Sequence, residues 1–102
     1  MNELVRKKQN KINLQFENHL FKNNKLLKKR LLEIPKTSGC YLFKDENGEI
    51  LYIGKSKTLR NRVNSYFSNF NELSPRLSLM VRQITEIEII LTDNEFEALN
   101  LE

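Results

Sequence analysis

Two tyrosines and a group of cations are the side chains in this sequence that could do chemistry. Tyr41 and Tyr52 stand on either side of residues 45–48, and four cations with no acidic residue among them follow the second tyrosine. These cations are Lys55, Lys57, Arg60 and Arg62. Phenol groups beside several positive charges suit contact with a phosphate chain better than burial in a protein core.

The segment between the two tyrosines predicts a β-hairpin. Asn-Gly at 47–48 tolerates the positive φ of a tight turn, and a short apolar run lies on each side of it. Residues 40–44 and 49–53 are therefore expected to pair as antiparallel strands. This pairing brings Tyr41 and Tyr52 close together.

A helix is predicted directly after the hairpin. Leu59, Val63 and Phe67 recur at helical spacing, so they are expected to face the core. Arg62 and Tyr66 lie one turn apart on a neighbouring stripe of the same helix. They can therefore act on one site.

The rest of the chain completes an α+β pattern. Residues 1–13 are polar and predict a frayed start or a loose helix, whereas apolar residues from Phe16 onward have helical spacing until Pro35 ends the helix. Pro75 suits the first turn of a short amphipathic helix, and residues 86–92 predict a third strand. We expect a small, mostly antiparallel three-stranded sheet flanked by helices.

The charge is unevenly distributed and suggests two parts. Residues 1–34 contain nine Lys or Arg against three Glu, although the whole chain has a net charge of +4. We therefore expect a basic N-terminal helical extension at 1–33 and a domain at 34–102. After the third strand, Thr92 and Glu95 form a capping-box pattern that predicts another helix.

Composition narrows the possible classes of protein. The 102 residues suffice for one domain with a modest core, and no apolar run approaches the ~20 residues of a membrane helix. One cysteine, Cys40, permits no internal disulfide, so we expect a cytoplasmic protein with Cys40 as a small buried side chain. His19 is the only histidine, which excludes a His/Cys metal site. A divalent ion would need carboxylates, which favours Mg²⁺ or Mn²⁺.

The two halves of the hairpin resemble the signature of the GIY-YIG nucleases. Gly39-Cys40-Tyr41 and Tyr52-Ile53-Gly54 have the spacing of the two motif halves, and the wider sequence is similar to the UvrC-type branch, which incises DNA in bacterial nucleotide excision repair. The resemblance runs from Ile34 to the end. The other residues that carry it are Pro35, Phe43, Gly48, Lys55, Lys57, Leu59, Arg62, Ser65-Tyr66-Phe67, Glu95, Glu97-Ala98-Leu99 and Leu101-Glu102. Cys40 replaces the usual Val or Ile, and Ser38 a frequent Pro, at positions not expected to carry chemistry.

The resemblance implies a metal-dependent DNA endonuclease that makes the 3′ incision beside a lesion. Tyr52 matches the general base, Arg62 the arginine that stabilises charge in the transition state, and Glu102 the single carboxylate that binds the divalent cation. The other matched positions around the active site are Tyr41, Tyr66 and Lys55. Lys57 and Arg60 are expected to contact DNA, and Gly54 to let the backbone pass close to the substrate.

The implied partners are DNA and UvrB, and two other classes of function stay open. One is a stand-alone GIY-YIG nuclease of another kind, and the other is a basic DNA-binding module without catalysis. Glu102 is the final residue, although the matching helix continues in the family. We therefore expect this chain, alone, to bind metal weakly and to cleave poorly.

Overall fold

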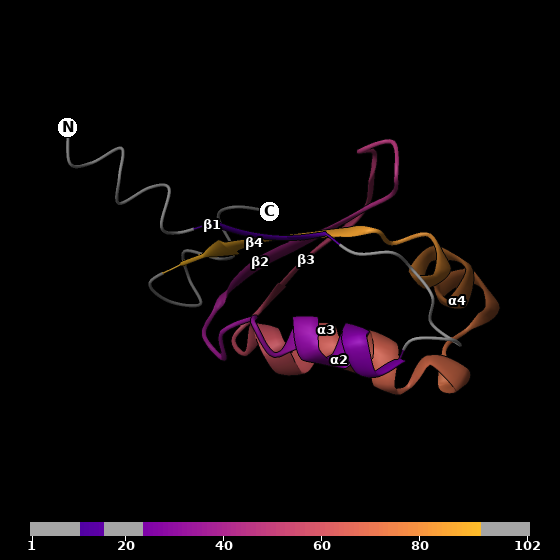
Figure 1. Cartoon of the computed structure of the whole chain (residues 1–102), viewed down its shortest axis with the longest axis horizontal. Helices are drawn as coiled ribbons and strands as arrows, with labels where there is room; N and C mark the ends of the chain where they lie inside the picture. The colour runs from indigo at the N-terminus through magenta and orange to yellow at the C-terminus, as the bar shows by residue number, and fades with distance from the viewer. Residues whose placement is uncertain (1–10, 16–23, 93–102) are drawn as a thin grey trace.

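The computed structural model describes residues 11–15 and 24–92, which form one sheet with two helices on one face and a third helix at one end (Figure 1). The elements in chain order are β1 (Lys11–Gln15), α2 (Asn24–Leu31), β2 (Gly39–Lys44), β3 (Ile50–Ser56), α3 (Leu59–Ser68), the 3-10 turn η1 (Phe70–Glu72), α4 (Pro75–Arg82) and β4 (Glu86–Leu91). The strands lie in the order β1-β4-β2-β3, and every pair is antiparallel. The α+β class is as expected from the sequence.

The sheet has four strands, so the expectation of three was wrong. The fourth strand is β1, where residues 11–13 had been expected to be frayed or helical. Its side chains alternate, with Leu14 buried and Lys11, Asn13 and Gln15 exposed, which is the pattern of a half-buried strand. The pattern is only five residues long, and β1 pairs with β4, far along the chain. Local periodicity therefore could not show the pairing.

The core lies between the sheet and the helices. Strand residues such as Phe43, Ile87 and Ile89 are fully buried against Leu59 and Val63 of α3. Leu14 of β1 and Leu27 and Leu31 of α2 belong to the same apolar cluster. β1 is therefore part of the sheet, and α2 packs onto the sheet. A domain boundary at residue 33 stays a prediction, and much of the predicted helix from Phe16 lies at 16–23, outside the described residues.

The hairpin turn forms as the sequence predicts. Gly48 has a φ of +81°, and its N–H donates to the carbonyl of Asp45 at 2.9 Å. The Asp45 carboxylate accepts hydrogen bonds from the backbone N–H groups of Asn47 and Glu49. A bulge between Phe43 and Lys44 then shifts the pairing of β2 with β3 by one residue.

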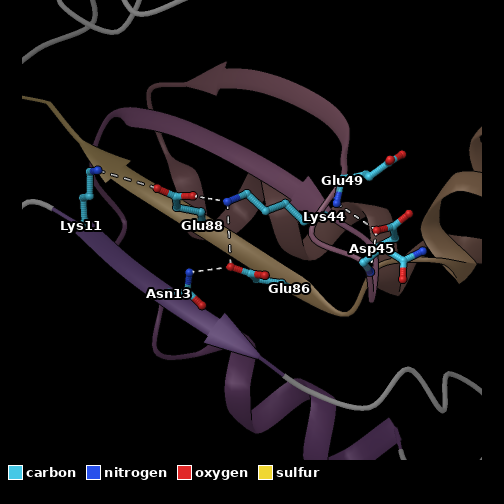
Figure 2. Close-up of polar contacts among 8 residues, drawn as sticks. Lys11, Asn13, Lys44, Asp45, Glu49, Glu86 and Glu88 are labelled. Carbon is cyan, nitrogen blue, oxygen red and sulfur yellow. Dashed lines mark hydrogen bonds and ion pairs between the residues drawn. The ribbon is translucent and has the colours of Figure 1, made fainter.

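The face of the sheet away from α2 and α3 carries a ladder of paired charges, shown in Figure 2. The Lys44 ammonium is 2.7 Å from a Glu88 carboxylate oxygen and 4.0 Å from Glu86. Lys11 of β1 is 4.0 Å from Glu88, and the Asn13 amide donates to Glu86 at 2.7 Å. We call these five side chains the charged face. They join β1, β4 and β2 across the strands.

Candidate active site

Tyr41 lies directly opposite a glycine on the neighbouring strand. The register pairs Tyr41 of β2 with Gly54 of β3. A Cβ atom at Gly54 would lie 2.3 Å from both Cζ and Oη of Tyr41, so only glycine leaves room for the phenol ring. This packing gives Gly54 a role that the sequence did not suggest, and its expected approach to DNA stays a prediction.

Three tyrosines gather on the helix side of the sheet, and we call them the tyrosine cluster. The ring centroids of Tyr41, Tyr52 and Tyr66 lie 6.0–6.2 Å apart, and the Tyr41 and Tyr66 hydroxyls form a hydrogen bond of 3.0 Å. Phe43 lies 5.1–6.3 Å from all three rings and has no exposed surface. Phe43 therefore packs against the cluster from the core. Sequence reasoning counted Phe43 in the motif but gave it no part in the site.

The tyrosines differ in their exposure to water. Tyr41 is 2% exposed, whereas Tyr52 is 40% exposed. Burial is the largest cause of a raised pKa at both Tyr41 and Tyr66, and the hydrogen bond to Tyr66 raises the pKa of Tyr41 further. Tyr41 and Tyr66 therefore stay protonated at neutral pH and act through their hydrogen bonds. Of the two strand tyrosines, Tyr52 is the one that reaches solvent.

Arg62 is the cation that acts on the tyrosine cluster. It lies on α3 one turn before Tyr66, and its charge lowers the pKa of Tyr41 and Tyr66, against the larger effect of burial. Among residues 11–15 and 24–92, its guanidinium pairs with no carboxylate. The structure thus places Tyr66 against both strand tyrosines and Arg62 within electrostatic range of Tyr41.

The other predicted cations lie in different surroundings. Lys55 pairs in register with Cys40, so it points to the opposite face of β3 from Gly54 and Tyr52. Lys57 is exposed in the turn between β3 and α3. The catalytic role of Lys55 and the DNA contact of Lys57 stay predictions. Cys40 itself is buried and free of any disulfide, as expected.

Arg60 directs its guanidinium to the backbone. Nε donates to the carbonyl of Ile34 at 2.7 Å and Nη2 donates to the carbonyl of Leu32 at 3.0 Å. Its predicted contact with DNA stays a prediction, but the side chain has a structural task that sequence reasoning missed. No local pattern could reveal it, because the acceptors lie 26 and 28 residues earlier in the chain.

The carboxylate predicted to bind the metal, Glu102, lies outside the described residues. The helix predicted after Thr92, with Glu95 in its capping box, lies outside them as well. Within the described ranges, no group of three or more metal-ligating side chains occurs. A donor set of one carboxylate with water suits Mg²⁺, which keeps several of its water ligands. The tyrosine cluster could supply only phenol oxygens to such a site.

The end of β4 lies beside the start of β2. Thr92 follows β4, and its N–H and hydroxyl both bond to Ser38, next to the start of β2. In the register this end of the sheet also holds Ser56, which pairs with Gly39. Thr92, the last described residue, therefore lies at the end of the sheet where Gly39 pairs with Ser56.

None of the helices in the described part of the chain is long and apolar enough to cross a membrane.

Comparison with known proteins identifies the relatives of this fold and site. Residues 37–102 match the model of the UvrC-like GIY-YIG domain. The chain is 74% identical over 92 residues to UvrABC system protein C of Prochlorococcus marinus subsp. pastoris, covering 90% of this chain and 14% of that protein. A second P. marinus UvrABC system protein C is 65% identical over 101 residues, covering 99% of this chain and 16% of that protein.

A solved structure shows the same fold. The GIY-YIG N-terminal endonuclease domain of UvrC from Thermotoga maritima, bound to its catalytic magnesium ion, is 36% identical with a TM-score of 0.64. The alignment covers 76% of this chain and 83% of that domain. The chain spans about one-sixth of the length of the curated relatives or less. The chain belongs to the UvrC-like GIY-YIG domain family.

Proposed function

We propose that this chain is the nuclease domain of a UvrC-type protein and hydrolyses one phosphodiester on the 3′ side of a DNA lesion. The observation that carries the proposal is the tyrosine cluster beside Arg62, in a chain 36% identical to a UvrC endonuclease domain. Its partners would be DNA and UvrB, and we expect it to act in the cytoplasm.

In the mechanism, the phenolate oxygen of Tyr52 accepts the proton of the attacking water, and the phenol that forms returns this proton to solvent, which Tyr52 reaches. Tyr41 and Tyr66 keep their protons, and one of these protons is used in the hydrogen bond between them. The other hydroxyl proton can be donated to water or a phosphate oxygen, and both rings fix the position of Tyr52 by packing. Arg62 places a permanent positive charge where negative charge develops on the phosphate.

A divalent cation, held by Glu102 and water, would supply Lewis-acid charge at the scissile phosphate. One structural feature supports Glu102 as its ligand. β4, the last described strand before Glu102, finishes at the end of the sheet where Gly39 pairs with Ser56, two residues from Gly54. Mg²⁺ or Mn²⁺ suits these oxygen ligands.

The test uses a chimaera, defined as the full-length P. marinus subsp. pastoris relative with this chain in place of its matching segment. The chimaera is mixed with UvrB and a duplex that carries one bulky lesion. We expect 3′ incision that requires Mg²⁺ or Mn²⁺ and stops with EDTA. Binding of the duplex without 3′ incision would support a non-catalytic DNA-binding module. Incision of undamaged branched DNA without UvrB would support a nuclease of another kind.

A further inference from the structure

The inference concerns Arg60 and rests on the proposed function. Arg60 and Leu59 connect the first turn of α3 to the segment that follows α2. The Arg60 guanidinium donates to the carbonyls of Leu32 and Ile34, and the Arg60 backbone N–H donates to the carbonyl of Pro35 at 3.1 Å. The Leu59 N–H donates to Thr37 at 3.0 Å. Four hydrogen bonds thus hold residues 32–37 on one helix end.

These bonds satisfy groups that have no partner within their own helix. The first N–H groups of a helix need outside acceptors, and Thr58, at the start of α3, makes no side-chain capping bond. Carbonyls just beyond the last turn of α2 need outside donors for the same reason. Arg60 supplies a planar fork that reaches two carbonyls at once, which a lysine ammonium cannot match in geometry.

Residues 32–37, which these four hydrogen bonds hold, lead directly into β2, the strand that carries Tyr41. A Cβ at Gly39, the first residue of β2, would lie 2.3 Å from the carbonyl oxygen of Ile90 and 2.8 Å from Cδ1 of Leu59. The start of β2 is therefore fixed against β4 on one side and α3 on the other. Leu59 has no exposed surface, so this contact has no room to adjust.

The four hydrogen bonds join α3, which carries Tyr66, to the segment that leads into β2, which carries Tyr41. Tyr41 is two residues beyond Gly39 on β2, whereas Arg62 and Tyr66 are on α3, beyond the first turn. The bond between the Tyr41 and Tyr66 hydroxyls spans these two elements. Its length depends on how the first turn of α3 sits against β2, and the Arg60 bonds secure that turn.

We propose that Arg60 is a positioning residue for cleavage, which holds residues 32–37 on α3 and so aligns Arg62 and Tyr66 with Tyr41. Its task is distinct from a contact with the DNA backbone. Loss of a phosphate contact would weaken DNA binding and lower its salt dependence by about one unit. Loss of a positioning residue lowers the rate of the chemical step instead, because small displacements of reacting groups are costly.

The experiment compares Arg60→Ala and Arg60→Lys in the chimaera, with Arg76→Ala as the matched control. Arg76 is an exposed arginine on α4 away from the tyrosine cluster, so its removal changes the net charge by the same amount. We measure kcat and KM for 3′ incision, and DNA affinity at several salt concentrations. We expect Arg60→Ala to lower kcat about 10- to 100-fold with an unchanged salt slope. Arg60→Lys keeps the charge and should restore only part of kcat.

A second measurement reports on the cluster without cleavage. The 13Cζ shifts of labelled tyrosine in the isolated chain should change for Tyr41 and Tyr66 in both Arg60 variants and stay at wild-type values in Arg76→Ala. Full recovery of kcat in Arg60→Lys, or a weaker salt slope with unchanged kcat in Arg60→Ala, would assign Arg60 to DNA. Wild-type tyrosine shifts and kcat in both variants would also overturn the proposal. A chimaera without any incision would refute the proposed function, and the shifts would then decide the role of Arg60 alone.

Discussion

The two faces of the sheet use polar side chains in opposite ways. On the charged face, Lys44, Glu86 and Glu88 satisfy one another across the strands, and Lys11 and Asn13 join them from β1. On the helix side, three phenols lie beside Arg62, and no carboxylate in the described part of the chain pairs with its guanidinium. Charges that neutralise each other hold strands together. A positive charge left beside hydroxyl groups is arranged for an anionic ligand such as phosphate.

The largest effect is expected at the exposed phenol of the tyrosine cluster. Tyr52→Phe removes only the hydroxyl and keeps the ring packed 6.3 Å from Phe43. We expect 3′ incision by the chimaera to fall about 10²- to 10⁴-fold, as for loss of a general base. DNA affinity and thermal unfolding should change little. Incision within a few-fold of wild type would exclude Tyr52 as the base and weaken the contrast between the two faces.

Arg62→Ala tests whether the cation of the tyrosine cluster acts on the transition state. We expect kcat for 3′ incision to fall about 10²-fold, with a smaller change in DNA affinity. Lys57→Ala is the comparison, because this exposed lysine is predicted to contact the DNA backbone. It should weaken binding and reduce the salt slope by about one unit while kcat at saturation stays the same. If Arg62→Ala altered only affinity, Arg62 would be a backbone contact.

Much of the fold could be predicted from local sequence signals. The Asn47-Gly48 turn, the core stripe of α3 and the Pro75 start of α4 all occur where expected, because each depends on neighbours within a few residues. The Ser74 hydroxyl accepts the capping hydrogen bond of α4, a local feature of the same kind. β1 was missed because its only evidence is five alternating residues whose partner strand is distant.

The site was harder to predict, because its residues meet through tertiary contacts. Lys44 pairs with Ile50 next to the turn, so uninterrupted counting along the hairpin would place Tyr41 opposite Ile53. The bulge at Phe43 and Lys44 shifts the pairing by one residue and brings Gly54 to Tyr41 instead. A bulge has no reliable sequence signal here, so the reason for a glycine at 54 appears only in the structure.

Gly54→Ala tests that reason. The new methyl group would overlap Tyr41, which is 2% exposed and has no free space to enter. We expect the free energy of unfolding to fall by about 1–3 kcal/mol and the Tyr41–Tyr66 hydrogen bond to be lost, with a clear loss of incision. Chemical denaturation of the isolated chain and the incision assay measure the two effects.

The matched control for Gly54 is Gly48→Ala. Gly48 has a φ of +81° and no atom within 4 Å of an added Cβ, so the substitution strains only the turn. It should cost about 1 kcal/mol of stability while incision stays near wild type. Equal losses of incision in the two variants would show that any weakening of the hairpin impairs the site, and would remove the special role of the contact between Gly54 and Tyr41.

The smallest effect is expected on the charged face. Lys44→Met and Glu88→Gln, alone and together, form a double-mutant cycle across a pair that is about one-fifth exposed on each side. We expect a coupling free energy of about 0.2–1 kcal/mol, typical of cross-strand pairs, and wild-type kcat in every variant. A tenfold loss of kcat in any of them would show that the charged face also serves catalysis.

The pH dependence of this coupling identifies its source. The ordinary pKa of a lysine side chain is 10.5, and the pKa of Lys44 is raised above this value in the folded state. The hydrogen bond to Glu88 is the largest cause. A raised pKa gives stability that is fully present below pH 10.5 and is lost as the pH rises through the folded value. Tyr41 and Tyr66 also have raised pKa values, so the whole domain should lose stability above about pH 10. The tyrosine contribution cancels in the cycle because all four proteins share it. The coupling should therefore stay constant from pH 7 to 10 and decline only above 10.5, and a decline below pH 9 would assign it to some other group.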